Sequence, residues 1–360
     1  MERTVALTWS WLNILTKKRV DALLTLRSDL SEALQALDEE LLRALGCREE
    51  TVFKTLNRLE EFDPAWYEKE LAKRKIAFLS FDDEGFPASI KEIGDPPVFL
   101  YSRGDLSVLS EPCIALVGTR EMSPYGKRVA ELFTPAFVQA GMVTVSGLAT
   151  GIDAVVAAET MRAGGRTVAV LGHGLGSIYP QSNARLAEEI VEHGGLLLSE
   201  FPLDAQPDKY TFPARNRIIA GLSLGTVVLE APVGSGALIT AELALDYGRD
   251  VFAVPGQIFD PNFAGSHLLL ASGQAKLVQK PEDVLIEIGI VGPDAGAVSA
   301  FTPSTPDEAA LYKILTTMPQ SLDDLVQRSG LAAGLIGATL TILELQGAVK
   351  GVGEGKWVRR

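Results

Sequence analysis

The sequence predicts a doubly wound α/β domain in the middle of the chain, with a helical segment before it and a small module after it. Between about residue 112 and residue 289, short apolar and β-branched runs alternate with segments of helical spacing. Most of these runs end in a turn rich in glycine and small polar residues. Buried runs joined by helices indicate a parallel sheet covered on both faces. Ligands of such domains lie beyond the carboxyl ends of the strands.

The expected core strands are the runs 114–117, 143–146, 168–171, 196–199, 227–229, 251–254 and 276–278. Helical patterns between them cover 128–140, 154–163, 183–193, 216–222, 237–247 and 267–272. A further short strand is expected at 76–80, where the core begins. The predicted domains are therefore short helices over 1–75, the core over 76–289, a linker over 290–306 and a terminal module over 307–360.

The terminal module is predicted to be a winged helix. Three helical segments near 307–316, 321–329 and 331–346 precede a strand pair at 348–350 and 356–358. A DNA-reading winged helix carries base-contacting side chains on its third helix. That segment has no Lys or Arg and carries Glu344. We therefore interpret the module as a protein-contact or structural unit, with DNA binding as the less favoured alternative.

Composition limits the kind of ligand site that the chain can form. Its 360 residues contain 33 Lys and Arg against 46 Asp and Glu, a net charge of −13. Nucleic-acid binders usually show a basic footprint, so any polyanion site must be a small patch built from a few arginines and backbone amides. Two cysteines, no signal-peptide pattern and no apolar run of about 20 residues predict a cytoplasmic protein without a membrane span.

The most informative stretch is Phe212–Gly221. Arg215, Asn216 and Arg217 open an apolar segment of helical spacing. Cations and amide donors at a helix start favour a phosphate-bearing ligand, because the free N–H groups and the macrodipole also attract anions. The alternative is that the two arginines pair with the nearby carboxylates of Glu200 or Asp208.

The turns after the strands supply further candidates for the same rim, because glycine lets backbone amides approach an anion closely. The candidate binding residues in these turns are Arg120, Ser123, Tyr125, Lys127, Ser146, Gly147, Thr150, Gly151, Gly234, Ser235 and Gly236. One such turn is weak support. Several that converge with Arg215 and Arg217 predict an extended phosphate-binding surface.

No cofactor, metal or catalytic group is predicted. The turn after the first core strand, which begins at Gly118, lacks the later glycines of a dinucleotide fingerprint, and the chain has no phosphate-loop motif. The three histidines lack metal-ligand spacing, and Ser146 has no partner base. His173 lies in a glycine turn, where a site role and a spacer role are equally favoured. Asp153 is interpreted as a helix N-cap, with the orientation of a neighbouring arginine as a second role.

These motifs resemble the DNA-processing protein A family (DprA, also called Smf) over roughly residues 76–285. The stretches that carry the resemblance are Leu116–Arg120, Ser146–Ala149 with Gly151–Asp153, Tyr179-Pro180, Leu198–Glu200, Phe212-Pro213 with Arg215–Ser223, Glu230-Ala231 and Val254–Gly256. The family implies an extended Rossmann-like core with a sterile-alpha-motif-like N-terminal domain and a winged helix. It also implies a bacterial, non-enzymatic protein that binds single-stranded DNA.

The resemblance implies further a homodimer that protects single strands and helps to load the RecA recombinase during transformation and recombination. Single-strand-binding protein is a further candidate partner. The family's phosphate-contacting arginines correspond to Arg120 and to Arg215 or Arg217. Two positions depart from the family: Thr150 stands where relatives often have Arg or Lys, and Ala157 where many have His.

Two details of the site follow from residue types. Tyr125, Tyr179, Tyr210 and Phe212 are candidate stacking platforms for bases, of which Phe212 is favoured. The segment Leu268, Leu269 and Leu270 is a candidate dimer interface, although core packing explains it equally well.

Two other functions remain open from the sequence. One is a nucleotide-acting enzyme of the nucleoside-monophosphate phosphoribohydrolase type, because Gly234-Ser235-Gly236 with Thr240 and Glu242 faintly resembles its glycine-rich turn and acid. The other is a dinucleotide-dependent oxidoreductase.

Overall fold

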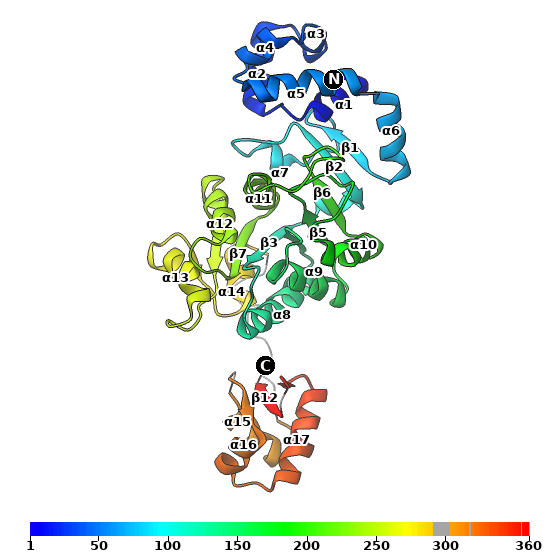
Figure 1. Ribbon diagram of the computed structural model, residues 1–360. Helices are drawn as coiled ribbons and strands as arrows, with labels where there is room; N and C mark the ends of the chain where they lie inside the picture. The colour runs from blue at the N-terminus through cyan, green and yellow to red at the C-terminus, as the bar shows by residue number, and fades with distance from the viewer. Residues whose placement is uncertain (291–302, 317, 354, 360) are drawn as a thin grey trace. The chain divides into compact units, whose positions relative to one another are not determined.

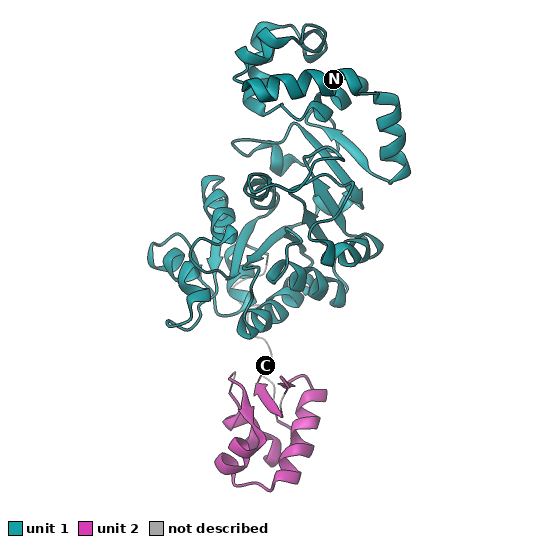
Figure 2. Cartoon of the chain, in the orientation of Figure 1, with its two compact units in different colours: residues 1–291 teal, residues 292–360 magenta. Residues whose placement is uncertain are grey.

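The computed structural model describes residues 1–290, 303–316, 318–353 and 355–359. The chain divides into two compact units, residues 1–291 and 292–360 (Figure 2). Most of the predicted linker, 291–302, lies outside the described residues. The boundary predicted near residue 75 falls within the first unit, just before its first strand.

The first unit is built on a sheet whose strand order is β1-β2-β6-β5-β4-β3-β7-β8-β9. Its strands are β1 (Ala77–Ser80), β2 (Phe99–Gly104), β3 (Cys113–Gly118), β4 (Val143–Ser146), β5 (Thr167–Val170), β6 (Leu196–Ser199), β7 (Gly225–Glu230), β8 (Asp250–Ala253) and β9 (Lys276–Leu277). All neighbours from β6 to β9 are parallel, whereas β1 and β2 add antiparallel pairs at one edge. The predicted doubly wound core is confirmed, and β2 is the strand that the sequence did not predict.

Helices cover both faces of this sheet (Figure 1). Alternate residues of β3 point to opposite faces: Ile114 and Leu116 pack in the cluster formed with α8, α9 and α14, whereas Ala115 and Val117 pack in the cluster formed with α11 and α12. The core helices are α7 (Ala88–Lys91), α8 (Pro124–Gln139), α9 (Ile152–Arg162), α10 (Ala184–Glu192), α11 (Thr211–Leu222), α12 (Gly236–Asp246), α13 (Ala264–Ala271) and α14 (Pro281–Glu287), with short 3₁₀ turns η1 (Leu106–Ser110), η2 (Gln181–Asn183) and η3 (Pro261–Phe263).

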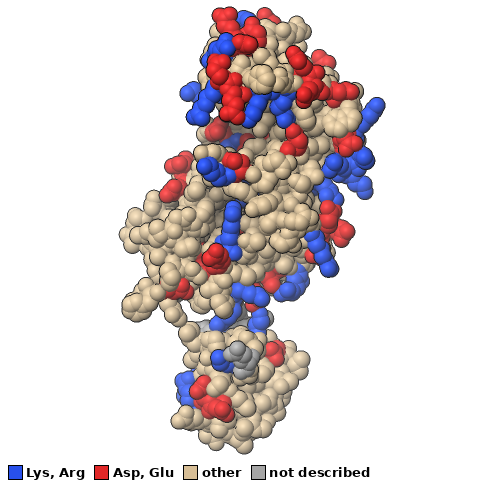
Figure 3. Space-filling model, in the orientation of Figure 1, with Lys and Arg blue, Asp and Glu red and all other residues tan. Residues whose placement is uncertain are grey.

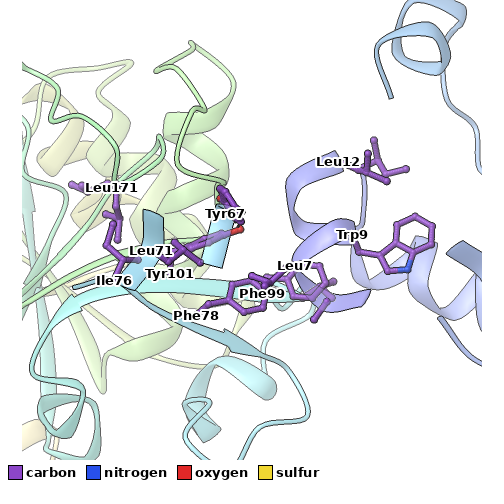
Figure 4. Packing of buried hydrophobic residues seen from close by; sticks show 14 of the residues in the cluster. Leu7, Trp9, Leu12, Tyr67, Leu71, Ile76, Phe78, Phe99, Tyr101 and Leu171 are labelled. Atoms are coloured by element: carbon purple, nitrogen blue, oxygen red, sulfur yellow. Dashed lines mark hydrogen bonds between the residues drawn. The ribbon is translucent and has the colours of Figure 1, made fainter. Parts of the chain in front are cut away.

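The N-terminal helices share a hydrophobic cluster with the β1–β2 edge of the sheet (Figure 4). Tyr101 of β2 is fully buried, and its hydroxyl lies 2.6 Å from Ser10 Oγ and 3.1 Å from the Tyr67 hydroxyl. These bonds satisfy polar atoms that would otherwise be buried without partners. The helices are α1 (Arg3–Leu12), α2 (Lys17–Leu26), α3 (Leu30–Gln35), α4 (Glu39–Ala44), α5 (Glu49–Glu61) and α6 (Pro64–Lys73).

The second unit has the helix order and terminal hairpin of the predicted winged helix. It contains α15 (Pro306–Ile314), β10 (Gln320–Ser321), α16 (Leu322–Ser329), α17 (Ala333–Leu345), β11 (Val349–Gly351) and β12 (Lys356–Arg359). The strand β12 pairs with both β10 and β11, and Leu340 and Leu343 of α17 pack in the unit's own core. Within the described part of the chain, no single helix combines the length and the apolar character needed to cross a membrane. Taken together, α16 and α17 have this length and apolar character, but the pair is bent by 110°.

Candidate functional site

A pocket of about 760 Å³ opens at the carboxyl ends of β3, β4 and β7. The chain order reverses here: β4 and β5 extend the sheet to one side of β3, and β7 and β8 extend it to the other. Such a switch point is the usual ligand site of an open α/β sheet. Eight residues predicted from the sequence line this pocket, namely Arg120, Tyr179, Phe212, Arg215, Asn216, Gly234, Ser235 and Gly236.

The guanidinium of Arg215 lies at the floor of the pocket. Arg215 sits on α11 and is only 5% exposed. Its Nη1 donates to the Gly147 carbonyl at 2.8 Å and also to the Val170 carbonyl, so it joins the ends of β4 and β5. A Cβ at Gly147 would lie 2.4–2.6 Å from the guanidinium atoms. Glycine is therefore required at 147 for the arginine to take this position.

Arg215 makes no ion pair among the described residues. Burial lowers its pKa to about 10, the carboxylate of Asp153 opposes the shift, and the nearby Arg120 adds to it. The side chain is still a cation at neutral pH. A buried charge without a counter-ion is costly, so this guanidinium favours an anionic ligand in the pocket.

Asp153 holds the loop after β4. Its Oδ2 accepts hydrogen bonds from the amides of Gly147, at 3.1 Å, and Ala149, at 3.2 Å. The predicted N-cap role is wrong, because Gly151 is the N-cap of α9 and Asp153 lies inside the first turn. The carboxylate interacts electrostatically with Arg215 but makes no ion pair with it. It shapes the loop that receives Arg215.

Asn216 joins α11 to the start of α12. Its Nδ2 donates to the Gly236 carbonyl at 3.1 Å, and Ser235 caps α12 by accepting from the Ala237 amide at 3.3 Å. Gly234, Ser235 and Gly236 therefore present the amino end of α12 to the pocket. The free N–H groups and the helix macrodipole make this end attractive to anions.

Aromatic and basic side chains line one wall of the pocket. The Arg120 guanidinium lies over the Phe212 ring, 5.0 Å from its centre, and the ring centres of Phe212 and Tyr179 are 5.9 Å apart. Lys209 also lines the pocket, and sequence reasoning missed it. Its position two residues before the start of α11 is the signal that could have found it. Arg120 and Lys209 are both exposed and make no ion pair within the described chain.

The lining is not formally cationic. Arg120, Lys209 and Arg215 are matched in number by Glu121, Asp153 and Asp208. On the face drawn in Figure 3, basic and acidic side chains are interspersed over the first unit, without a broad basic surface. Attraction for an anion must therefore be local, at the three cationic side chains of the lining and at the amino end of α12, as the net charge of the chain required.

Several predicted residues are not part of the pocket lining. Ser123 caps α8 and donates to the buried carboxylate of Glu230 at 3.0 Å, while the Tyr125 hydroxyl donates to the Pro255 carbonyl at 3.1 Å. Lys127 lies 3.9 Å from Glu131, and Ser146 Oγ donates to the Leu116 carbonyl at 3.0 Å. These residues support the turns, and a DNA-contacting role for them stays a prediction.

Gly151 lets the loops after β3 and β4 touch. Its φ is +80°, and a Cβ there would lie 2.4 Å from the Thr119 carbonyl oxygen and 2.6 Å from the Arg120 carbonyl oxygen. Neighbouring Thr150 is exposed and outside the lining, whereas Ala157 is buried in the hydrophobic cluster with α10.

Arg217 lies apart from the pocket lining. It forms an ion pair with Glu200 and lies 3.7 Å from Asp95, with 12% of its side chain exposed. Burial raises the pKa of Glu200, and Arg217 opposes that shift. For Arg217, the structure therefore matches the pairing alternative considered from the sequence.

The three leucines of the candidate dimer interface have different surroundings. Leu268 is 57% exposed, Leu269 is 4% exposed within the core, and Leu270 is partly buried against it. Only Leu268 of these three offers a large apolar surface to a partner.

Comparison with known families identifies two matching regions. A family model described as DNA recombination-mediator protein A matches residues 77–289, and one described as DprA winged helix domain matches residues 296–355. The chain is 40% identical over 285 residues to Protein Smf of Escherichia coli, covering 77% of this chain and 76% of that protein. It is 42% identical over 256 residues to DNA processing protein DprA of Streptococcus pneumoniae, covering 70% of this chain and 88% of that protein.

Two solved structures are similar in fold as well. The X-ray structure of DNA processing protein A from Streptococcus pneumoniae aligns with a TM-score of 0.60 at 41% identity, covering 70% of this chain and 86% of that one. A structure of DNA processing protein A from Helicobacter pylori, reported for its single-stranded DNA binding mode, aligns with a TM-score of 0.54 at 30% identity. The alignment covers 59% of this chain and 95% of that one.

Proposed function

This chain belongs to the DNA recombination-mediator protein A family, and from that premise we propose that its pocket binds single-stranded DNA and that the protein helps to load the RecA recombinase. The family description as a recombination mediator and the single-strand binding reported for the Helicobacter pylori relative support this function. The strand would be protected while it is delivered to the recombinase during transformation and recombination. Single-strand-binding protein stays a predicted further partner.

The observation that carries the proposal is the buried guanidinium of Arg215, which makes no ion pair with a described residue and lines an open pocket. A DNA phosphate would form the ion pair that Arg215 lacks among the described residues. Exposed Arg120 and Lys209 extend the contact along the wall. Phosphate contacts and backbone amides do not distinguish bases, so the binding is expected to be independent of sequence.

We propose no catalytic activity at this site. Glu242, the acid of the enzymatic alternative, is exposed on α12 and outside the pocket lining. Asp153 accepts hydrogen bonds from two loop amides through Oδ2, which assigns it a role in holding the loop after β4. Incubation with AMP tests this part: release of adenine would favour the phosphoribohydrolase alternative.

We propose also that two copies pair through the edge of the sheet near β9. Ile258 is 79% exposed, Phe259 91%, Leu268 57% and Leu277 53%, and β9 is an edge strand. Leu277 lies on β9, Leu268 on α13, and Ile258 and Phe259 between β8 and η3. Exposed apolar side chains and edge strands are both common at interfaces. Pairing would join two small pockets and raise the affinity for one strand through effective concentration. Light scattering of Phe259→Asp against the wild type tests this: a dimer should become a monomer.

Cytoplasmic location is part of the same proposal, since the DNA partner and RecA are found there. The two cysteines, Cys47 and Cys113, are buried and unpaired, as is usual in a reducing compartment.

Fluorescence anisotropy with a labelled oligo-dT, competed by unlabelled duplex of equal length, tests the proposed binding. The wild type should bind the single strand in preference to the duplex. Arg120→Ala should weaken this binding, whereas Arg185→Ala should not, because Arg185 is 91% exposed on α10 and pairs with Glu189. Equal affinities of the wild type, Arg120→Ala and Arg185→Ala for the oligo-dT would contradict the proposed binding site. A RecA strand-exchange assay then tests loading.

A further inference from the structure

We propose that the single strand continues from the pocket at the carboxyl ends of β3, β4 and β7, the central pocket, into a second site that binds a further phosphate of the same strand. The inference rests on the proposed function and extends it toward the N-terminal helices. The second site is a pocket of about 310 Å³, lined by the end of α1, by α5 and by the loop after β6. We call it the α5 pocket.

The two pockets lie along the same edge of the sheet. The strands β6, β5, β4, β3 and β7 are consecutive parallel neighbours, so their carboxyl ends meet at one edge. The N-terminal helices pack against the β1–β2 edge, next to β6 (Figure 1). In the loop 200–210, which leads from β6 to α11, Gln206 lines the α5 pocket and the next residue, Pro207, lines the central pocket. A single strand that crosses the loop here would pass from one pocket into the other.

The loop between the two pockets is held on both sides. On the side of the sheet, the Gly174 amide donates to the Ala205 carbonyl at 2.9 Å, and the Gly176 amide donates to the Leu203 carbonyl at 3.2 Å. On the side of the N-terminal helices, the Tyr67 hydroxyl accepts a hydrogen bond from the Leu203 amide at 3.0 Å. These bonds fix the loop, so the α5 pocket is formed before a ligand arrives, which lowers the cost of binding.

Arg58 of α5 shapes the α5 pocket. Its guanidinium donates to both carboxylate oxygens of Asp204, at 2.8 and 3.2 Å, and twice to the Trp11 carbonyl, at 2.7 and 3.1 Å. It also lies over the Trp11 ring, 4.2 Å from its centre. Arg58 is therefore a positioning residue, which joins α5 to the loop after β6 and neutralises the carboxylate of the lining.

The remaining polar side chains of the α5 pocket suit a phosphate. The Lys54 ammonium pairs with Glu50 at 2.6 Å, but both side chains are more than two-thirds exposed. Exposed pairs of this kind are weak, so a phosphate can take over the ammonium. Thr55 is 2% exposed, and its hydroxyl has no hydrogen-bond partner among the described residues. The other polar residues of the lining are uncharged, namely Asn13, Thr51 and Gln206.

The charge of the lining favours an anion. Lys54 and Arg58 outnumber Asp204 in the α5 pocket, whereas cations and carboxylates are equal in number in the central pocket. A cleft lined by an excess of one charge concentrates ligands of the opposite charge. A phosphate contact carries no base preference, so the second site would keep the binding independent of sequence.

Oligo-dT of two lengths tests the inference, one of about 6 nucleotides and one of about 16. Lys54→Gln should reduce the salt slope of the long oligomer by about 0.7 and leave that of the short oligomer unchanged. Lys73→Gln is the matched control, because Lys73 is 76% exposed, pairs with Glu70 on α6 and lies outside both linings. It should change neither slope.

The reactivity of lysines toward an acetylating reagent gives a second readout on the wild-type protein, with mass spectrometry to identify the modified residues. The long oligo-dT should protect Lys54 and Lys209, which line the two pockets. The short oligo-dT should protect Lys209 and leave Lys54 reactive. Lys73 should stay reactive with both oligomers.

The outcomes distinguish this inference from the proposed function. If the wild type binds neither oligomer, the proposed function fails. If the long oligomer binds but leaves Lys54 as reactive as in the free protein, the second site fails and the central pocket stands. The same conclusion follows if Lys54→Gln, shown to be folded by thermal melting, keeps the wild-type slope for the long oligomer.

Discussion

The Nη1 atom of Arg215 donates to the Gly147 carbonyl at 2.8 Å, and this bond fixes a buried cation beneath the pocket. The contact exists because residue 147 has no side chain. Cation and glycine come from segments 68 residues apart in the chain. They meet because β4 and α11 lie at the same end of the parallel sheet.

Gly147→Ala tests this contact. The added Cβ would lie within 2.6 Å of the guanidinium, so Arg215 must move. We expect weaker oligo-dT binding and a destabilisation of about 1–3 kcal/mol from overpacking. Gly337→Ala on α17, where a Cβ meets nothing within 4 Å, is the control and should leave binding unchanged. Anisotropy and chemical denaturation measure both; full binding by Gly147→Ala would oppose the account.

Thr150→Arg is expected to strengthen binding. Thr150 is exposed beside pocket-lining Ala149, so a long cationic side chain at this position would lie near the pocket. One new phosphate contact should steepen the plot of log affinity against log salt by about 0.7. Thr150→Gln adds length without charge and should leave the slope alone. The same slope in both variants would place residue 150 away from the strand.

Arg217→Gln should reduce stability more than binding. The substitution leaves the Glu200 carboxylate buried without its partner, and breaking such a pair costs about 3–5 kcal/mol. Chemical denaturation should show this loss, whereas the salt dependence of oligo-dT binding should match that of the wild type. A reduced salt slope with unchanged stability would instead make Arg217 a phosphate ligand.

His173 should make stability depend on pH. Burial lowers its pKa below the ordinary 6.5, and Arg215 acts in the same direction, against the Gly174 carbonyl. Below pH 6.5 the unfolded chain therefore binds a proton that the folded chain excludes, and stability falls as the pH drops. Melting temperatures at pH 7.5 and 5.5 measure this effect. His173→Gln should show a smaller drop than the wild type, and exposed His193→Gln should show the same drop.

The sequence predicted the elements that depend on local pattern. Apolar runs such as 143–146 and 196–199 form strands with the same bounds. Every residue of these two strands is buried, as expected for the interior of a sheet covered on both faces. The strand β2 was not predicted, since its pairing with β1 and β6 depends on distant segments.

The site was predictable in its location and only partly in its members. Arg215 and Arg217 are two residues apart on α11, and such residues do not face the same side of a helix. One faces the pocket, and the other faces Glu200. The hydrogen bonds that two loop amides donate to Asp153 depend on the path of the loop 147–151, which its composition does not fix.

The salt dependence of oligo-dT affinity tests the central claim most directly, when measured for the wild type, Arg120→Ala and Arg215→Gln, each checked for folding. If both guanidinium groups contact phosphates, each substitution should lower the affinity and reduce the slope by about 0.7. Slopes and affinities equal to those of the wild type in both folded variants would contradict a phosphate site at this pocket.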